Sequence, residues 1–144
     1  MGYALIKKEG WEDFVDAVVM EPGWAGVLLS REPGLLEARG PLGETPLLFL
    51  SIEFFGLGPI AWLLNRGANI NATDQFGGTA ISYALQIYQR PLVDYLLARG
   101  ASLGFSVLGH GTIADMAKME QAPDWKAYLV SLAARAGKRK LNWG

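Results

Sequence analysis

The chain of 144 residues is long enough to bury one hydrophobic core, and its composition excludes several classes of function. Hydrophobic residues make up 51% and charged residues 19%, which argues against disorder, and a net charge of −1 provides no basic surface for a nucleic acid. The chain has no cysteine, so disulfides, thiolate catalysis and zinc–thiolate sites are excluded.

We expect neither a secretion signal nor a lipid anchor at the N-terminus. No long apolar run precedes the first acidic residues, and Ile6 stands where N-myristoylation requires Ser or Thr. The longest mostly apolar stretch, residues 54–64, is interrupted by two glycines and a proline, and its eleven residues fall short of the about 20 that a membrane-spanning helix needs. The sequence therefore predicts a soluble, cytoplasmic protein that binds no membrane.

The first element in chain order is the segment 11–39, for which the sequence predicts two amphipathic helices. Carboxylates cluster at positions 12, 13 and 16 of this segment. We expect them to form a solvated face that complements the positive end of the first helix dipole, rather than an active site.

From residue 40 onwards the sequence repeats itself. The stretch LLNRGANINATDQFGGT at 63–79 is echoed by LLARGASLGFSVLGHGT at 96–112, an interval of 33 residues. Threonines at 45, 79 and 112 each follow a glycine-rich segment and open an apolar run. Leucine-rich pairs recur with the same interval, each behind an aromatic residue: Trp62, Tyr95 and Tyr128. Three series that share one period indicate an internal repeat.

Each repeat is expected to contain two helices. Thr45 followed by Pro46 predicts a helix start, because the threonine hydroxyl can accept a free amide and proline at the first position has no amide to leave unpaired. Thr112 and Asp115 have the spacing of a capping box. The expected first helices span about 46–53, 80–87 and 113–120.

The second helix of each repeat is expected to begin near a proline, namely Pro59, Pro91 or Pro123. Gly67 and Gly100 follow the last turn of two of these helices, where a left-handed residue commonly ends a helix. An extended segment and a turn come next. In the clearest turn, Asp74 begins it and Gly77 closes it.

These features resemble the ankyrin repeat, whose pattern is Asp-x-x-Gly-x-Thr-Pro-Leu-His-x-Ala followed by x-Leu-Leu-x-x-Gly-Ala-Asp-x-Asn-Ala. Residues 63–72 match the second half with Asn69 in place of Asp, residues 43–47 match the first half, and residues 74–79 match the turn. The resemblance covers about residues 40–136 directly. It implies an all-α fold in which helix–turn–helix units with short β-turn tips stack into a solenoid.

The resemblance implies a single ankyrin-repeat domain over residues 1–144. Its expected parts are a degenerate N-terminal capping repeat at 11–39, repeats at 40–73 and 74–106, a C-terminal capping repeat at 107–136 and a solvated basic tail at 137–144. The first full repeat carries one extra residue within 54–59, which predicts a longer connection between its two helices.

The sequence departs from the family pattern at the histidine that normally ties neighbouring turns together. Leu48, Ser82 and Asp115 stand at that position. The resemblance implies that Ser82 and Asp115 can supply part of this hydrogen bonding and Leu48 none. The third repeat carries Val107 and His110 in place of the turn aspartate and glycine, so we expect its tip to differ in shape.

The usual function of ankyrin repeats is recognition of another protein by the concave side, which consists of turn tips and first helices. The positions that the repeat maps there are Arg39, Pro41, Leu42, Glu44, Ile52, Glu53, Gln75, Phe76, Gln86, Ile87, Leu108 and Met119. Leu42, Phe76 and Leu108 occupy one tip position in successive units, and a row of exposed apolar side chains favours a partner site. The alternative is that the tips fold back onto neighbouring units.

The sequence predicts no catalytic residue, metal or cofactor. His110 is the only histidine and lies in a turn, and no Gly-x-Ser-x-Gly nucleophile elbow exists. One histidine without cysteine leaves only carboxylates to complete a zinc site. Residues 56–61 begin like a dinucleotide loop but lack its third glycine. We expect the aromatic series of Trp62, Tyr95 and Tyr128 to pack between second helices.

Three alternatives to a general protein-binding module stay open. The chain can be an immunity protein that binds and neutralises a cognate bacterial toxin, a ligand-binding or enzymatic protein on an atypical scaffold, or a self-assembling protein. We expect a monomer when the protein is free, and a protein partner rather than a nucleic acid.

Overall fold

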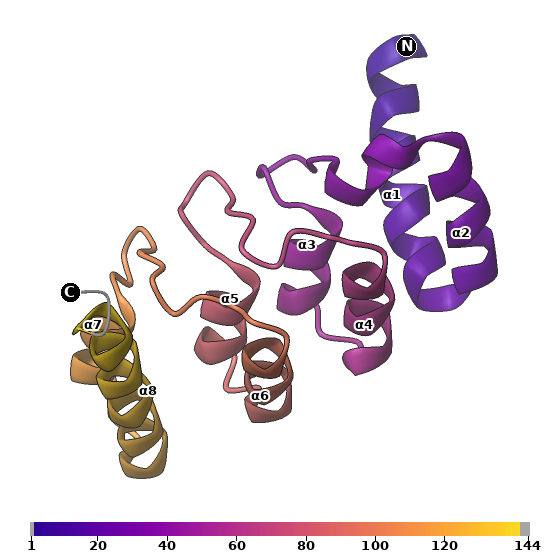
Figure 1. The fold of residues 1–144 in the computed structure, drawn as a ribbon. Helices are drawn as coiled ribbons and strands as arrows, with labels where there is room; N and C mark the ends of the chain where they lie inside the picture. Colours follow the sequence, from indigo (N-terminus) through magenta and orange to yellow (C-terminus); the bar gives the residue numbers. More distant parts are fainter. Residues whose placement is uncertain (1, 142–144) are drawn as a thin grey trace.

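The computed structural model describes the fold of residues 2–141 and the side chains of residues 10–137. Over residues 2–141 the chain is all-α, with eight α-helices, one short 3₁₀ helix and no β-strand. The elements are α1 (Gly2–Met20), α2 (Pro22–Arg31), η1 (Pro33–Glu37), α3 (Pro46–Ile52), α4 (Leu57–Asn65), α5 (Ala80–Gln86), α6 (Arg90–Ala98), α7 (Ile113–Met119) and α8 (Pro123–Leu141). Figure 1 shows the α-helices as four pairs in a row, with the longer connecting loops raised on one side.

The first helices of the repeats begin where the sequence predicts, because a threonine caps each one. Helices α3, α5 and α7 start directly after Thr45, Thr79 and Thr112. Each threonine hydroxyl accepts the backbone N–H three residues further on, at 3.3 Å. Each helix has seven residues and ends one residue earlier than expected.

The second helices α4 and α6 end at the predicted glycines. Gly67 and Gly100 have φ angles of 91° and 90°, in the left-handed region where glycine is favoured. Four residues connect α3 to α4 and three connect α5 to α6. The longer connection predicted in the first full repeat is therefore confirmed.

The N-terminal segment forms the two predicted helices and one element that the sequence did not indicate. Helix α1 begins at Gly2, before the predicted segment, and η1 follows α2. The indole N–H of Trp11 donates to the carbonyl of Ala38 at 3.0 Å, and its ring meets that of Phe49 edge-on at 5.4 Å. Because Phe49 lies on α3, this contact attaches the first helical pair to the next one.

The hydrophobic core is a line of side chains shared by successive pairs. It includes Leu47, Leu50, Ile81, Leu85, Ile113 and Met116 from the first helices, and Ile60, Leu63, Leu92, Leu96, Leu129 and Leu132 from the second helices. Helix α3 packs directly on α5, and α1 packs on α3 and α4. Helices of seven residues are unstable alone, so packing between units supplies their stability.

Side-chain hydrogen bonds to the backbone also join the first unit to the second and the second to the third. A carboxylate oxygen of Glu37 accepts the N–H of Asn69 at 3.0 Å, and the amide oxygen of Asn71 accepts the N–H of Ser102 at 2.9 Å. The expected role of Ser82 and Asp115 between turns is wrong. Their oxygens fold back and accept the N–H of the threonine that caps their own helix.

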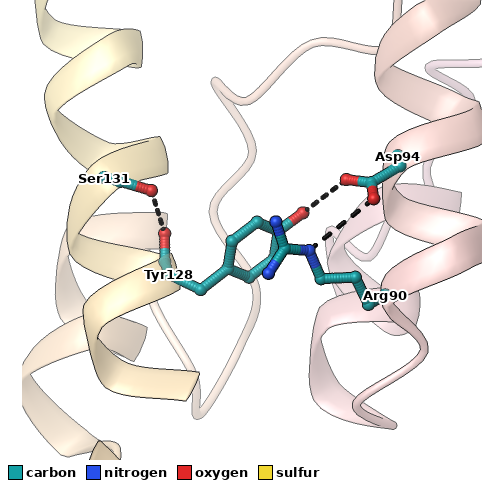
Figure 2. A network of polar contacts seen from close by, with 4 residues as sticks. All are labelled: Arg90, Asp94, Tyr128 and Ser131. Carbon is teal, nitrogen blue, oxygen red and sulfur yellow. Dashed lines mark hydrogen bonds and ion pairs between the residues drawn. The ribbon is translucent and has the colours of Figure 1, made fainter. Parts of the chain in front are cut away.

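The aromatic series on the second helices is partly buried against the core, and its third member bridges two second helices as predicted. Each ring of Trp62, Tyr95 and Tyr128 lies under an arginine guanidinium. Figure 2 shows that third member: the Tyr128 hydroxyl donates to Asp94 Oδ1 at 3.0 Å, and Arg90 Nε lies 3.6 Å from Asp94 Oδ2. Burial, and then the hydrogen bond to Asp94, raise the pKa of Tyr128 from 10.0 to about 12. This contact ties α6 to α8.

Helix α8 extends past the expected end of the last repeat. It continues to Leu141, so residues 137–141 of the expected tail are helical. The remaining residues of that tail, 142–144, lie outside the described residues. Near the start of α8, Lys126 Nζ donates to the carbonyls of Ala117 and Lys118 at 2.8 and 3.3 Å, and so satisfies the end of α7.

Candidate functional site: the turn tips and first helices

The tip at residues 74–78 is built around the carboxylate of Asp74. Asp74 Oδ1 accepts the N–H of Phe76 at 2.9 Å and of Gly78 at 3.0 Å, and Oδ2 accepts the hydroxyl of Tyr83. Burial, and then the contact with Asp74, raise the pKa of the Tyr83 hydroxyl above its ordinary value. Because both oxygens of the carboxylate are engaged, Asp74 fixes the turn that presents Phe76.

Glu44, which we expected on the exposed binding surface, is buried, with 6% of its surface exposed. Its Oε1 accepts the N–H of Leu42 at 3.2 Å, and the carboxylate covers Gly40 so closely that a Cβ at Gly40 would lie 1.9 Å from Oε1. Glu44 therefore shapes the first tip from within. It positions Leu42 and is not itself available to a partner.

Arg39, another predicted contact residue, joins the first tip to the second. Its Nη1 donates to the carbonyl of Gly43 at 2.8 Å and to the carbonyl of Thr73. The side chain of Arg39 remains exposed to solvent. One guanidinium thus holds two neighbouring tips in a fixed relation.

The second and third tips are also joined, in this case through the backbone. The N–H of Leu108 donates to the carbonyl of Phe76 at 2.9 Å. Gly77 has a φ of 79°, and a Cβ there would lie 2.4 Å from the carbonyl oxygen of Ser106. Only glycine fits this close approach without a backbone shift.

The third tip differs from the others in its backbone angles, as predicted, although the same hydrogen bonds close it. Val107 N–H donates to Gly111 O at 2.9 Å, which matches the bond from Asp74 N–H to Gly78 O at 3.1 Å. The left-handed residues of the third tip are Gly109 and Gly111, whereas the second tip has Gly77. The third tip therefore turns at two left-handed glycines and has no aspartate like Asp74 to accept its backbone N–H groups.

The three tip residues predicted to form an apolar row are exposed. Leu42 exposes 55% of its surface, Phe76 38% and Leu108 76%. Leu42 and Leu108 therefore do not fold back into neighbouring units, whereas Phe76 is the most covered of the three. Gln75 and Pro41, at the same tips, are exposed as well.

The predicted residues on the first helices are less uniform. Ile52 and Glu53 are exposed, whereas Gln86 and Ile87 are only half-exposed. Met119, at the end of α7, exposes 52% of its surface.

Two exposed aromatic side chains were absent from the predicted set. Phe55 and Tyr88 expose 59% and 55% of their surfaces in the connections after α3 and α5. They are 33 residues apart, so the period of the repeat was the signal that could have identified them.

The described side chains form no cluster of the kind that holds a metal ion. Among side chains 10–137 no group of three His, Asp or Glu residues is placed to share a metal ion. His110 lies in the third tip with its backbone N–H bonded to Val107 O at 3.0 Å, and its side chain is exposed. No helix within residues 2–141 combines the length and the apolar character needed to cross a bilayer.

Comparison with known proteins finds similarity to an ankyrin repeat protein over part of the chain. The chain is 36% identical over 64 residues to the putative ankyrin repeat protein L92 of Acanthamoeba polyphaga mimivirus. The match covers 44% of this chain and 16% of the viral protein, so the chain spans a small part of that relative's length. No family model matches the sequence. The relative and the helical fold together support a relationship to ankyrin repeats.

Proposed function

We propose that this chain is an ankyrin-type solenoid that binds a partner protein through the surface of turn tips and first helices. The observation that carries the proposal is the row of exposed apolar tip residues Leu42, Phe76 and Leu108. Exposed apolar side chains gathered on one surface commonly mark a site of protein contact.

The way in which the tips are held supports this proposal. Arg39 bonds the first tip to the residue before the second, and the backbone bond from Leu108 to Phe76 joins the second to the third. A surface fixed before binding loses less conformational freedom when a partner docks, so more of the contact energy remains as affinity.

Each apolar side chain of the row is large enough to anchor an interface. Burial of one such side chain in a partner contributes about 1.5–3 kcal/mol. Few residues carry most of the binding energy in typical interfaces, and aromatic residues are enriched among them. Phe76, held at the centre of the row by Asp74, is accordingly the residue whose loss we expect to weaken binding most.

Capture experiments test the proposal. The chain is immobilised, exposed to a lysate of its source cell, and the retained proteins are identified by mass spectrometry. We expect Phe76→Asp and Leu108→Asp to fold normally and to lose the retained partner. Val130→Asp is the matched control, because Val130 exposes 51% of its surface on α8, away from the tips. Retention of the same partner by both tip variants would contradict the proposed site.

The same experiment separates a scaffold from an inhibitor. If the captured protein is a toxin, its activity should fall in proportion to the added chain and recover with the tip variants. If its activity is unchanged, the chain is an adaptor and the immunity-protein hypothesis is wrong.

A further inference from the structure

The first helical pair exposes apolar side chains at its end of the row, where Figure 1 shows α1 and α2 beyond α3 and α4. Met20, the last residue of α1, exposes 77% of its surface, and Trp24 and Val27 on α2 expose 45% and 38%. Terminal units of a stacked-repeat protein normally carry polar outer faces, because no further unit covers them. The first pair therefore has an apolar face without a partner in the described part of the chain.

A hollow of about 320 Å³ lies in this face, where α1 meets α2. Its lining is partly apolar and partly acidic, and consists of Asp13, Asp16, Ala17, Met20, Glu21 and Trp24. Asp16 stands two residues, and so about 200° around the helix, from Phe14, whose ring packs on that of Trp62 in α4. The hollow thus faces away from the next helical pair.

The carboxylates of the hollow are unpaired among the described side chains. Within residues 10–137, Asp13, Asp16 and Glu21 make no side-chain hydrogen bond and no ion pair. The expectation that the carboxylates of α1 complement the positive end of its dipole is wrong, because α1 begins well before them and places them in its second half. The nearby guanidinium of Arg31 lies over the ring of Trp24, 5.6 Å from its centre. The hollow is therefore an acidic surface that calls for an outside cation.

The other end of the row carries the opposite charge. Over residues 125–141, along α8, the chain has five cationic residues and no carboxylate. Val130, with 51% of its surface exposed, stands two residues from Tyr128, which bonds to α6, and so lies on the opposite side of α8. Ala134 follows on that side and is exposed, and Lys138 occupies the next position at helical spacing. The outward side of α8 is thus first apolar and then basic in sequence.

We propose that the outward side of α8 docks into the hollow between α1 and α2 of a second copy of this chain. Val130 packs on Met20 and Trp24 of the other copy, and the cationic end of α8 lies over Asp13 and Asp16. The chain's own α8 does not fill this hollow, because the two lie at opposite ends of the row in Figure 1.

The spacing of the two surfaces agrees with this docking. Met20 and Asp13 are seven residues apart on α1, or about 10.5 Å along the helix, and Val130 and Lys138 are eight apart on α8, or about 12 Å. With Val130 on Met20, an α8 antiparallel to α1 brings position 138 beside Asp13. Because two different surfaces meet, the contact does not close on itself, and further copies add to the row.

This contact uses none of the turn tips, so it leaves the surface of the proposed function free. It goes beyond that function and stands or falls separately from it. The monomer expected from the sequence then applies to dilute protein, and assemblies form as the concentration rises.

Sedimentation equilibrium of the full chain, from micromolar to millimolar concentration, tests the inference. We expect the average mass to rise above that of one chain, and the rise to shrink as salt is added, because opposite charges contribute to the contact. Val130→Asp, Asp13→Lys and Lys138→Glu should each keep the mass of one chain. Since Val130 and Asp13 are exposed, their variants should unfold at the urea concentration of the wild type.

Mixtures of the variants identify the two surfaces. Asp13→Lys mixed with Val130→Asp should form pairs and nothing longer, because the intact α8 of one variant meets the intact hollow of the other. Asp13→Lys mixed with Lys138→Glu should form longer assemblies, since the reversed charges also match each other. Val130→Asp mixed with Lys138→Glu is the control. Both are changed on α8, so this mixture should keep the mass of one chain.

Each alternative outcome has a definite meaning. Wild-type protein that keeps the mass of one chain up to millimolar concentration would overturn the inference, as would association that all three variants retain. A mixture of Asp13→Lys and Val130→Asp that forms no pairs would also overturn it. Phe76→Asp should associate as the wild type does. If Phe76→Asp is the variant that loses association, the tips join the copies and the docking into the hollow is wrong.

Discussion

The junction between α3 and α5 and the junction between α5 and α7 join equivalent helices, yet only the first is closed. Helix α3 packs directly on α5, and Arg39 binds together the two tips above them. Between α5 and α7 a groove lined by Gln86 and Met119 remains open. Equivalent helices of one repeat can therefore pack closely at one junction and leave a groove at the next.

Aromatic side chains bridge the open junction. The rings of Tyr88 and Trp125 lie 5.3 Å apart, between the connection after α5 and the start of α8. Two aromatic rings thus contact each other across the junction. At the tips, the bond from Leu108 to Phe76 holds the same two units together. The two units are therefore joined at the tips and again through these rings.

The largest expected effect comes from Gly77, where the second tip meets the third. Gly77→Ala should destabilise the fold by about 3 kcal/mol, because the left-handed conformation and the contact with Ser106 both oppose a Cβ. Gly109→Ala is the matched control: its φ is 83° but no atom lies within 4 Å of the added Cβ, so we expect about 1 kcal/mol. Urea unfolding measures both, and equal losses would show that the tips do not touch.

Arg39 provides the next largest effect, at the closed junction. Arg39→Met should lower the free energy of unfolding by about 1 kcal/mol, since two carbonyls lose a charged donor at an exposed site. Arg135→Met on α8 removes an exposed arginine and should change little. Amide exchange near Gly43 and Thr73 should speed up in Arg39→Met. An unchanged exchange rate there would contradict the contact that Arg39 makes between the two tips.

Tyr128 tests the contact between the outer helices through its pH dependence. Because folding raises the pKa of Tyr128 from 10.0 to about 12, the folded state keeps a proton that the unfolded chain has released. Stability should therefore be full below pH 10 and fall between pH 10 and 12. Tyr128→Phe should reduce this fall, and Tyr83→Phe should show how much of the remainder belongs to Tyr83, whose pKa is also raised. A wild-type profile that Tyr128→Phe leaves unchanged would contradict the bond to Asp94.

The smallest expected effect is a gain at the open junction. Gln86→Leu should raise the free energy of unfolding by about 0.5–1 kcal/mol, because an unpaired buried donor is removed. Gln75→Leu is the comparison at an exposed tip, where we expect no gain. A loss of stability in Gln86→Leu would mean that the amide is paired in solution.

Local chemistry was sufficient to predict much of the fold. The threonine caps located the starts of α3, α5 and α7, because the cap is a contact between residues three apart. The extra residue before α4 predicted a longer connection, and glycines at 67 and 100 predicted helix ends. The exposure of the tip row followed from the same repeat, since equivalent positions have equivalent surroundings.

The errors concern features that the repeat pattern does not specify. Glu44 was expected at the surface, but the turn folds its carboxylate onto Gly40. Gln86 and Ile87 were expected to be exposed, but both are half-buried. The 3₁₀ helix η1 was missed because a run of five residues carries no periodic pattern long enough to recognise. The contact between Tyr88 and Trp125 joins residues that are far apart in the chain.

Hydrogen exchange of the chain, with and without the captured partner, tests the central claim most directly. We expect new protection at the tips, residues 40–44, 74–78 and 107–111, and along the exposed ends of the first helices. Protection confined to α4, α6 and the outer face of α8, with the tips exchanging as in the free protein, would contradict the account.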